Sequence, residues 1–265
     1  MRLIPMAFSL AVLVAEISAA EEPISETELS KMISQLNLAT ETIDLNDPPY
    51  KHGEAFGEPT CFANWFYCSQ TVFFNREVMS GGPYSTNVTP IFSQDALLFN
   101  DNDEPSKIGS TQSTAKLEAS TKGWQISARI GVSQDRFTAD INAQYKDETI
   151  KSTTMTKTVE YSSTCPPHKT CRIQTVTFKA QLVGFCADDP YLLCTNSPDF
   201  GPEHEISICT VDDTWVTSCS QYREYARKTE ELCKNRKDPR KYCEVEVPLL
   251  DDKGEPLRAV VITHG

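Results

Sequence analysis

Ten cysteines, four histidines and pairs of adjacent aspartates are the residues of this 265-residue chain that could do chemistry. A zinc site needs closely paired ligands such as CxxC, and the sequence has no such pair. It also has neither a GxSxG nucleophile motif nor an HExxH metalloprotease motif. The aspartate pairs are typical of turns, and the histidines are scattered: Asp188-Asp189, Asp212-Asp213, His52, His168, His204 and His264. We therefore expect no enzymatic activity, no metal site and no cofactor.

The N-terminus has the form of a secretory signal peptide. Arg2 precedes an apolar run from Leu3 to Ala15, and Ser18-Ala19-Ala20 supplies the small residues of a cleavage site. A short membrane anchor is the alternative, but the run is too short for one and Glu16 follows it directly. We expect residues 1–20 to be removed and the protein to be secreted and extracellular.

Export to an oxidising compartment predicts that the ten cysteines form up to five disulfides. Their distribution is uneven, because none lies between Ser69 and Thr164. A segment without disulfides remains free to rearrange, and this is the physical meaning that we give to the gap. Among the many pairings, we favour the local pairs Cys61–Cys68 and Cys165–Cys171. The expected disulfide residues are Cys61, Cys68, Cys165, Cys171, Cys186, Cys194, Cys209, Cys219, Cys233 and Cys243.

Charge and composition exclude two classes of function. The net charge is −12, so simple electrostatic binding to nucleic acid or anionic lipid is disfavoured. Beyond the N-terminus no run of eighteen apolar residues exists, which excludes a helical membrane protein. Asn87-Val88-Thr89 is a glycosylation sequon that Pro90 weakens, so we name Asn87 as a candidate glycosylation site.

The segment Ser110–Thr164 contains no cysteine or proline, and 18 of its 55 residues are Ser or Thr. Proline-free sequence rich in threonine favours extended strands, since nothing interrupts the ladder. We predict two very long strands joined by a tight turn.

The rest of the chain predicts ordinary elements. Apolar residues at helical spacing predict helices over Glu26–Asn37 and Ser220–Lys234, while Pro, Gly and Asp predict a loop over Thr42–Pro59. Glu244–Leu250 and Leu257–Thr263 flank a turn and predict a hairpin. An aromatic cluster surrounds a predicted strand, and we favour a local core over an exposed ligand platform for it: Phe62, Trp65, Phe66, Tyr67, Phe73 and Phe74.

Within Ser110–Thr164, apolar residues occupy every second position on both sides of a turn at Gln134-Asp135. A register centred on that turn makes the apolar faces of both strands coincide and places opposite charges face to face, which stabilises a sheet. The predicted facing pairs are Val132 with Phe137, Ile130 with Ala139, Ala128 with Ile141, Ile126 with Ala143, Trp124 with Tyr145, Arg129 with Asp140, Lys122 with Asp147 and Glu118 with Lys151.

Each apolar stripe spans nine residues and ends at Trp124 and Tyr145, an arrangement typical of an aromatic girdle at a membrane interface. This length is the lower end of what a tilted membrane strand needs. A lone hairpin leaves backbone groups unsatisfied in lipid, so it could cross only as one part of an oligomeric barrel. The alternative is a half-buried antiparallel strand pair in a soluble sheet, which shows the same alternation.

Over about residues 95–184 the ordered set of elements resembles the aerolysin-like pore-forming proteins of the epsilon-toxin and mosquitocidal-toxin type. The matching elements are Leu97–Asp103 followed by Pro105, the strand Ser110–Thr121, Gly123-Trp124 in the hairpin 122–147, the return strand Thr149–Tyr161, the turn Cys165–Lys169 and the strand Arg172–Val183. The cysteines from Cys186 to Cys243 and the helix Ser220–Lys234 are not part of this pattern.

The resemblance implies a mainly β fold: an elongated antiparallel sheet with long strands and an amphipathic insertion hairpin, here with two short helices and many disulfides. We expect a signal peptide (1–20), an N-terminal head region (21–94), the long-strand region (95–184) and a Cys-rich C-terminal region (185–265).

The function that the resemblance implies is a secreted toxin or virulence factor that binds a cell-surface receptor or lipid, forms a homo-oligomer and inserts a β-barrel pore. The implied membrane-facing residues are Trp124, Ile126, Ala128, Ile130, Val132, Phe137, Ala139, Ile141, Ala143 and Tyr145, and the implied lumen-facing residues are Gln125, Ser127, Arg129, Ser133, Thr138, Asp140, Asn142, Gln144 and Lys146. The alternative is a secreted disulfide-rich effector or binding protein that uses the β scaffold without forming pores.

Overall fold

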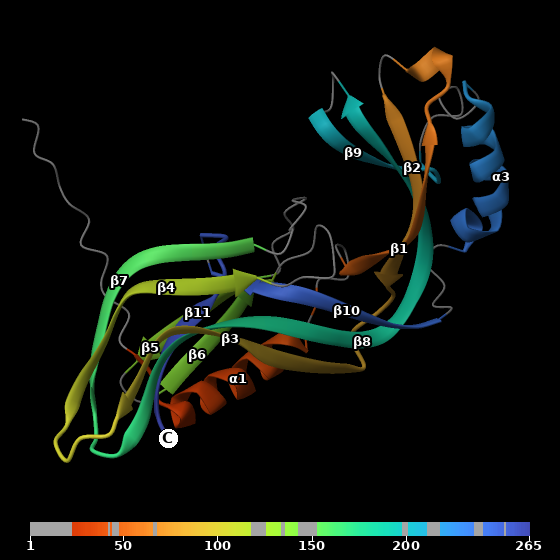
Figure 1. The fold of residues 1–265 in the computed structure, drawn as a ribbon. Coiled ribbons are helices and arrows are strands. Elements are labelled where there is room, and N and C mark those ends of the chain that lie inside the picture. The colour runs from red at the N-terminus through yellow and green to blue at the C-terminus, as the bar shows by residue number, and fades with distance from the viewer. Residues whose placement is uncertain are drawn as a thin grey trace, which may run out of the picture.

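The computed structural model is mainly β, as predicted, and it is elongated and bent, with a small head joined to a longer body (Figure 1). It describes residues 23–41, 43, 48–65, 68–117, 126–133, 136–142, 153–197, 201–210, 218–235, 241–251 and 253–265, so the predicted signal peptide lies outside the described residues. The helices are α1 (Glu26–Thr40), the one-turn η1 (Phe62–Asn64) and α3 (Ser220–Lys234). The strands are β1 (Tyr50–Pro59), β2 (Gln70–Met79), β3 (Ser85–Asn100), β4 (Ser106–Leu117), β5 (Ile126–Ser133), β6 (Arg136–Asn142), β7 (Thr153–Cys165), β8 (Lys169–Ser197), β9 (Gly201–Ser207), β10 (Lys241–Leu250) and β11 (Arg258–His264).

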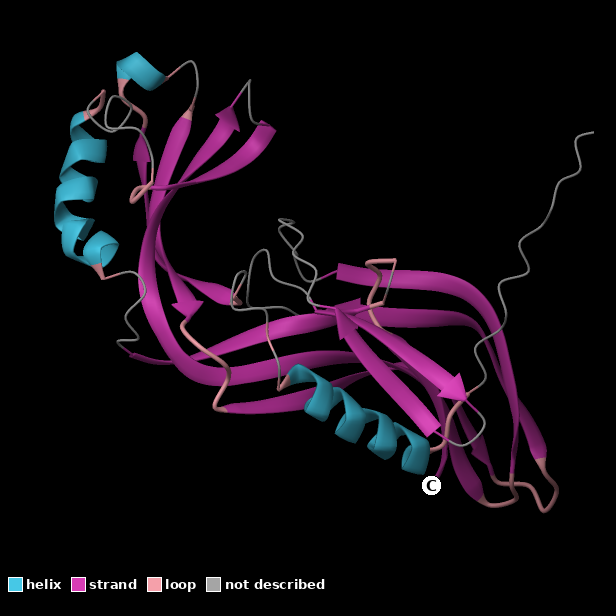
Figure 2. Cartoon of the chain, turned by 180° about the vertical axis from the view of Figure 1, so that it is seen from behind, coloured by secondary structure: helices cyan, strands magenta, loops and turns pink. Residues whose placement is uncertain are grey.

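The strand β8 organises the main sheet, because it pairs antiparallel with other strands along both of its edges. On one edge it pairs with β2 in the head and then with β3 in the body. On the other edge it pairs with β9, then β10, then β11. Figure 2 shows β8 curving without a break from the body into the head. Head and body are therefore continuous through the backbone of one strand.

Helix α1 begins at a capping box, as its sequence favours. The Ser25 hydroxyl accepts a bond from the Glu28 N–H, and the Glu28 carboxylate accepts one from the Ser25 N–H at 2.7 Å. Its buried face carries Leu29, Met32 and Leu36, which pack on one face of the body sheet. The predicted helix Glu26–Asn37 is confirmed, with one more turn at its C-terminal end.

Helix α3 has the predicted bounds and covers the head strands. Tyr222 and Tyr225 are buried against Phe73, and their hydroxyls bond to Thr71 Oγ1 and to the Phe74 carbonyl, each at 2.8 Å. The aromatic cluster is thus divided. Phe73 and Phe74 lie in the core, whereas Phe62 and Trp65 around η1 are 86% and 54% exposed, and Phe66 and Tyr67 lie outside the described residues.

Part of the segment Thr42–Pro59, predicted as a loop, is instead the strand β1, and that prediction was wrong. β1 pairs with β2 alone and so lies at the sheet edge, where proline and glycine are tolerated. Close packing favours glycine at position 53, since a Cβ there would lie 3.2 Å from the Asn75 carbonyl oxygen. Tertiary pairing overrides the local composition here.

The predicted hairpin after Glu244 was also wrong in topology, although its strands and its turn exist. β10 and β11 pair in succession with the same edge of β8 instead of with each other along their length. Pro248 lies opposite Lys179 and Arg258 opposite Thr177 in one nearly continuous ladder. Residues 249–257, which comprise the end of β10 and the turn after it, leave this ladder as a short loop that the Leu250–Pro256 bridge closes. We call this segment the β10–β11 loop.

All ten cysteines pair, as the even count predicted. The local pair Cys165–Cys171 is confirmed, whereas Cys61–Cys68 is wrong. Cys61 bonds Cys219 at the start of α3, and Cys68 bonds Cys194 on the neighbouring strand. These partners are separated by more than a hundred residues, so only the assembled head brings them together. The remaining disulfides are Cys186–Cys243 and Cys209–Cys233.

The Ser/Thr-rich segment is extended, as predicted, but its strands are four and not two in the described residues. β4 pairs with β7, and β5 pairs with β6 as a separate pair. The β5–β6 pair lies beside α1 and the end of β10, away from β4 and β7 (Figure 1). Contact with the body therefore divides what the sequence alone presented as one long hairpin.

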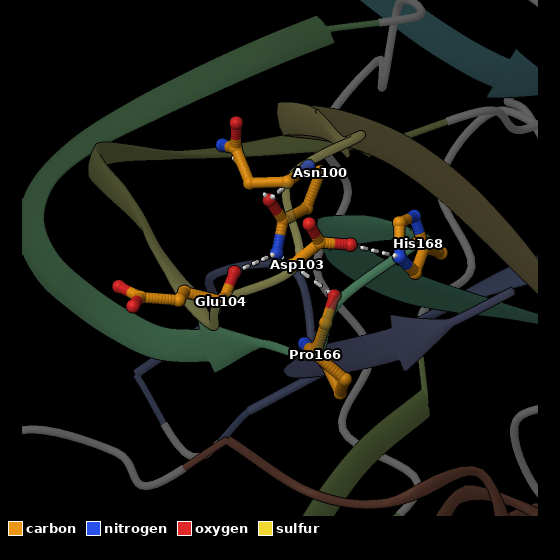
Figure 3. A network of polar contacts seen from close by, with 6 residues as sticks. Asn100, Asp103, Glu104, Pro166 and His168 are labelled. Atoms are coloured by element: carbon orange, nitrogen blue, oxygen red, sulfur yellow. Dashed lines mark hydrogen bonds and ion pairs between the residues drawn. The ribbon is translucent and has the colours of Figure 1, made fainter.

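Asn100 joins the two turns at the far end of the body (Figure 3). Its buried amide nitrogen donates to the carbonyl oxygens of Glu104, Cys165 and Pro166 at 2.9–3.0 Å. Its oxygen accepts a bond from the Ser106 hydroxyl at 2.9 Å. The turn between β3 and β4 is thereby fixed to the turn between β7 and β8.

We predict that Asn100→Ala lowers the free energy of unfolding by about 1–3 kcal/mol, because it leaves buried carbonyl groups without their donor. Urea denaturation of the purified protein measures this change. The matched control is Asp101→Ala at an exposed position in the same turn, which should change the free energy by no more than about 0.5 kcal/mol. Equal effects of the two variants would contradict the assignment.

Candidate functional site

The hairpin β5–β6 is the candidate functional site, and its register is the predicted one. The structure places Val132 opposite Phe137, Ile130 opposite Ala139 and Arg129 opposite Asp140. Ala128 lies opposite Ile141, and Ser127 lies opposite Asn142. The remaining predicted positions of the hairpin lie outside the described residues: Lys122, Trp124, Gln125, Gln134, Asp135, Ala143, Gln144, Tyr145, Lys146 and Asp147, as do Glu118 and Lys151.

The hairpin is joined to the main sheet by a short parallel ladder. In the part of the chain that the structure describes, two residue pairs make it: Ile126 with Leu249 and Ser127 with Leu250. Leu249 and Leu250 are buried at the end of β10. The helix α1 lies beside β6 (Figure 1). By comparison, β3 pairs with β8 over nearly its whole length, so the attachment of the hairpin is small.

The β10–β11 loop holds the place where the hairpin is attached. The Asp251 carboxylate accepts bonds from the N–H groups of Lys253 and Glu255, each at 2.9 Å. Glu255 in turn forms an ion pair with Lys157 on β7, and this hydrogen bond lowers the pKa of Glu255. The loop thus contacts the β4–β7 pair and carries the residues that pair with β5.

The β4–β7 pair packs across β8 through two different kinds of contact. Near Asn100 the contact is apolar, with Ile108 and Tyr161 against Ile173. Farther along it is polar: Ser113 and Thr175 share a buried hydroxyl hydrogen bond of 2.8 Å. The Asp95 carboxylate on β3 accepts bonds from Thr175 Oγ1 at 2.6 Å and from the Thr114 N–H at 2.9 Å. Water can replace such hydrogen bonds, so this half contributes less net stability than the apolar half.

A second cluster of chemically capable residues lies at the neck, where the head meets the body. Arg76 is buried between the rings of Tyr50 and Tyr191, with its guanidinium carbon 4.2 and 3.8 Å from their centroids. It forms an ion pair with Glu205 on β9, and His52 Nε2 lies 3.4 Å from the other oxygen of that carboxylate. The cluster therefore links β1, β2, β8 and β9.

Sequence reasoning missed this cluster, and counted His52 only among the scattered histidines. No local signal could have revealed it, because Arg76 and Glu205 are brought together only by the pairing of β2 and β9 with β8. Burial alone would raise the pKa of Glu205. The His52 ring and the positive charge of Arg76 outweigh burial and lower the pKa of Glu205 to about 2.

The arrangement is structural in character. A buried, fully paired carboxylate with a lowered pKa is a poor general base and favours an ion pair instead. No group of three metal-ligating side chains occurs within the described residues. Neither helix that the structure describes has the length and apolar character of a membrane-crossing helix.

No family model and no curated protein matches the sequence. Among solved structures, the chain is similar to a lamprey immune protein, with 12% identity and a TM-score of 0.26 over 68% of this chain and 48% of that one, so it spans about half the length of that protein. It is also similar to a chain of the Cry23Aa1 and Cry37Aa1 binary protein complex, with 12% identity and a TM-score of 0.18 over 83% and 87% of the two chains. A third is parasporin-2, a Bacillus thuringiensis toxin that recognizes cancer cells, with 12% identity and a TM-score of 0.15 over 71% and 85%. These TM-scores are too low to assign a family.

The lowered pKa of Glu205 predicts a loss of stability in acid. The ionised form of Glu205 is favoured in the folded state. The free energy of unfolding that Glu205 contributes is therefore complete above its ordinary pKa of 4.5 and is lost as the pH falls towards about 2. The side chain is 13% exposed, and the shift corresponds to about 3 kcal/mol.

We expect Glu205→Gln to flatten the fall in unfolding free energy between pH 5 and pH 3, in addition to destabilising the protein at pH 7 because Arg76 loses its partner. Urea titrations at several pH values give the slope. Glu160→Gln on the exposed side of β7 is the control and should keep the wild-type slope. A wild-type slope in Glu205→Gln would exclude this carboxylate as the source of the loss of stability in acid.

Proposed function

We propose that this protein is a secreted aerolysin-like pore former that binds a cell surface, assembles with its own copies and inserts β5–β6 into the membrane as part of a β-barrel. The observation that carries the proposal is the register of the hairpin. It places apolar positions of one strand opposite apolar positions of the other, as for Val132 with Phe137 and Ile130 with Ala139. A strand pair with one continuous apolar face and one polar face is what a water-filled barrel requires.

The attachment of the hairpin supports its release. Two residue pairs of parallel ladder and a contact with α1 hold it to the body, whereas a barrel would pair both of its edges along their whole length. The polar half of the β4–β7 contact can also exchange its hydrogen bonds for water at low cost. We propose that these two contacts open when the protein assembles.

The lengths of the strands also support one long inserted hairpin. Leu117 lies opposite Thr153 and Ser127 opposite Asn142, so the stretches between them, 118–126 and 143–152, differ by one residue. A single β-bulge would join the two pairs into one ladder. From Ser106 to Ser133 such a strand would extend about 90 Å at about 3.3 Å per residue, which exceeds the thickness of a bilayer.

The disulfides leave the proposed moving part free. Four of the five join elements of the head and the neck, and the fifth closes the short turn at Cys165–Cys171. The head would serve for recognition, and Phe62 and Trp65 around η1 are exposed there. We propose no enzymatic activity for either part.

The second candidate function is a soluble, disulfide-rich binding or effector protein. The head favours it, because its cross-linked fold and exposed aromatic residues are features of a binding module by themselves. In that case β5–β6 would remain on the body, and the experiments below would find no lysis.

We predict that Ile130→Asp reduces dye release from susceptible liposomes or cells at least tenfold and leaves surface binding unchanged. A charge on the lipid-facing side opposes insertion, and the cost is repeated in every subunit of an oligomer. The matched control is Thr138→Asp, which adds the same charge at a position predicted to face the lumen and should retain lysis. Equal lysis by both variants would contradict the proposed assignment of lipid-facing and lumen-facing positions. No lysis by the wild-type protein on any membrane would contradict the proposed pore-forming function.

A disulfide that fixes the hairpin to the body should block lysis. Ser127 and Leu250 are register partners, so Ser127→Cys with Leu250→Cys should cross-link β5 to β10. We expect loss of dye release under oxidising conditions and recovery with mild reductant, relative to wild-type protein treated with the same reductant. The control is Ser127→Cys with Asn142→Cys, which links the two strands of the hairpin and should retain lysis. Lysis by the oxidised β5–β10 variant would contradict release of the hairpin.

A further inference from the structure

Near the neck, no described element covers one face of the body sheet, which we call the open face. The other face carries Val88, Ala180 and Val247, which are buried in the same core as the apolar face of α1. The open side is covered by the β4–β7 pair only as far as Thr177, whose hydroxyl donates to the Lys116 carbonyl. Beyond that point, the odd-numbered residues of β8 from Lys179 to Phe185 are at least partly exposed. Gly184 lies between them and faces the opposite side of the sheet, where the buried Met79 packs against it.

An exposed aromatic pair lies on this open face. Phe185 and Tyr242 are register partners on β8 and β10, and they are 53% and 66% exposed. Their rings meet edge to face, with centroids 6.2 Å apart. Beside them the Gln181 amide donates to Glu244, and Lys179 Nζ donates to Glu246 at 3.0 Å. Apolar rings next to amides and carboxylates suit a sugar, which has apolar C–H faces and a rim of hydroxyls.

The glycosylation sequon lies on the same face. Asn87 on β3 is the register partner of Gln181, and Gln181 is also the partner of Glu246, so the three side chains lie in one row on one side of the sheet. Asn87 is exposed, and the middle residue of the sequon, Val88, is buried on the opposite side. Phe185 is four residues from Gln181 along β8, which is about 13 Å, and it lies on the same side because the separation is even.

We propose that Asn87 carries an N-linked glycan and that its first sugars lie along this face on Phe185 and Tyr242. In the transfer, the Asn87 carboxamide nitrogen bonds to C1 of the reducing sugar of a lipid-linked oligosaccharide diphosphate. The bond from C1 to the diphosphate oxygen breaks, the amide nitrogen loses one proton, and the lipid diphosphate leaves. An oligosaccharyltransferase of the producing cell would catalyse this step during secretion.

The covalent attachment of the glycan at Asn87 is the reason to assign the open face to this glycan. A sugar fixed at Asn87 is present at high effective concentration over the face, so weak stacking is enough to keep it there. A glycan in that place shields an aromatic pair that would otherwise expose apolar surface to other molecules. The inference rests on the secretion that both candidate functions share, and it does not depend on pore formation.

The first test is the intact mass of the full-length protein secreted from a eukaryotic cell line, before and after treatment with peptide N-glycosidase. We expect one glycan mass in the wild-type protein and none in Asn87→Gln or Thr89→Ala. A wild-type protein secreted without a glycan, or a glycan that persists in Asn87→Gln, would overturn the proposal.

The second test measures how fast the enzyme releases the glycan from the native protein. Stacking protects the glycan, so we expect release to be about two- to tenfold faster from Phe185→Ser/Tyr242→Ser, the range to which aromatic contact energies correspond. Phe62→Ser, which removes an exposed aromatic residue of the head, is the control and should release at the wild-type rate. Tyr242→Ser alone, checked for native circular dichroism, guards against misfolding of the double variant. Equal rates in wild type and in the folded platform variants would overturn the stacking.

Discussion

The backbone ladder of β8 is the interaction on which the rest of the structure depends. One strand of 29 residues pairs on one edge with β2 and β3 and on the other with β9, β10 and β11. Its alternation places Ala180 and Leu182 under α1 and leaves Gln181 and Phe185 on the open side. Because each neighbour is set by its register with β8, a shift of one residue would exchange core and surface along the whole body.

The chain divides into a cross-linked part and a part held only by non-covalent contacts. In the head, one disulfide joins the start of η1 to the start of α3, and another joins the turn after β9 to α3. The ion pair of Arg76 with Glu205 holds the strands of the neck together. Between Ser69 and Thr164, strands are held by ladders, by the Asn100 network and by hydroxyl hydrogen bonds such as that of Ser113 with Thr175. Local opening therefore costs least in the second part, where no covalent link opposes it.

What the sequence could predict follows from the range of the interactions concerned. The helices Glu26–Asn37 and Ser220–Lys234, the register of β5 with β6 and the six-residue closure Cys165–Cys171 all depend on nearby residues, and all are confirmed. The strand β1, the partner of Cys61 and the in-line arrangement of β10 and β11 depend on β8 as a common neighbour or on the assembled head, and these were missed. The expected division into regions 1–20, 21–94, 95–184 and 185–265 stays a prediction. The strand β8 is continuous across residue 184.

The two registers of the Ser/Thr-rich segment bear on why β4–β7 and β5–β6 are separate pairs in this structure. The β4–β7 ladder and the β5–β6 ladder differ by one residue, so they do not join without a bulge in the stretches between them. β5 instead pairs with Leu249 and Leu250 at the end of β10. In water, that contact and α1 give the hairpin a place on the body. Under the proposed function, assembly with other copies would supply longer ladders at both edges and so outweigh the bulge and the short attachment together. Under that proposal, the alternation of apolar and polar positions along β5 and β6 is the property that suits the membrane. The net charge of −12 does not oppose insertion, because insertion depends on which positions are apolar and not on the total charge of the chain.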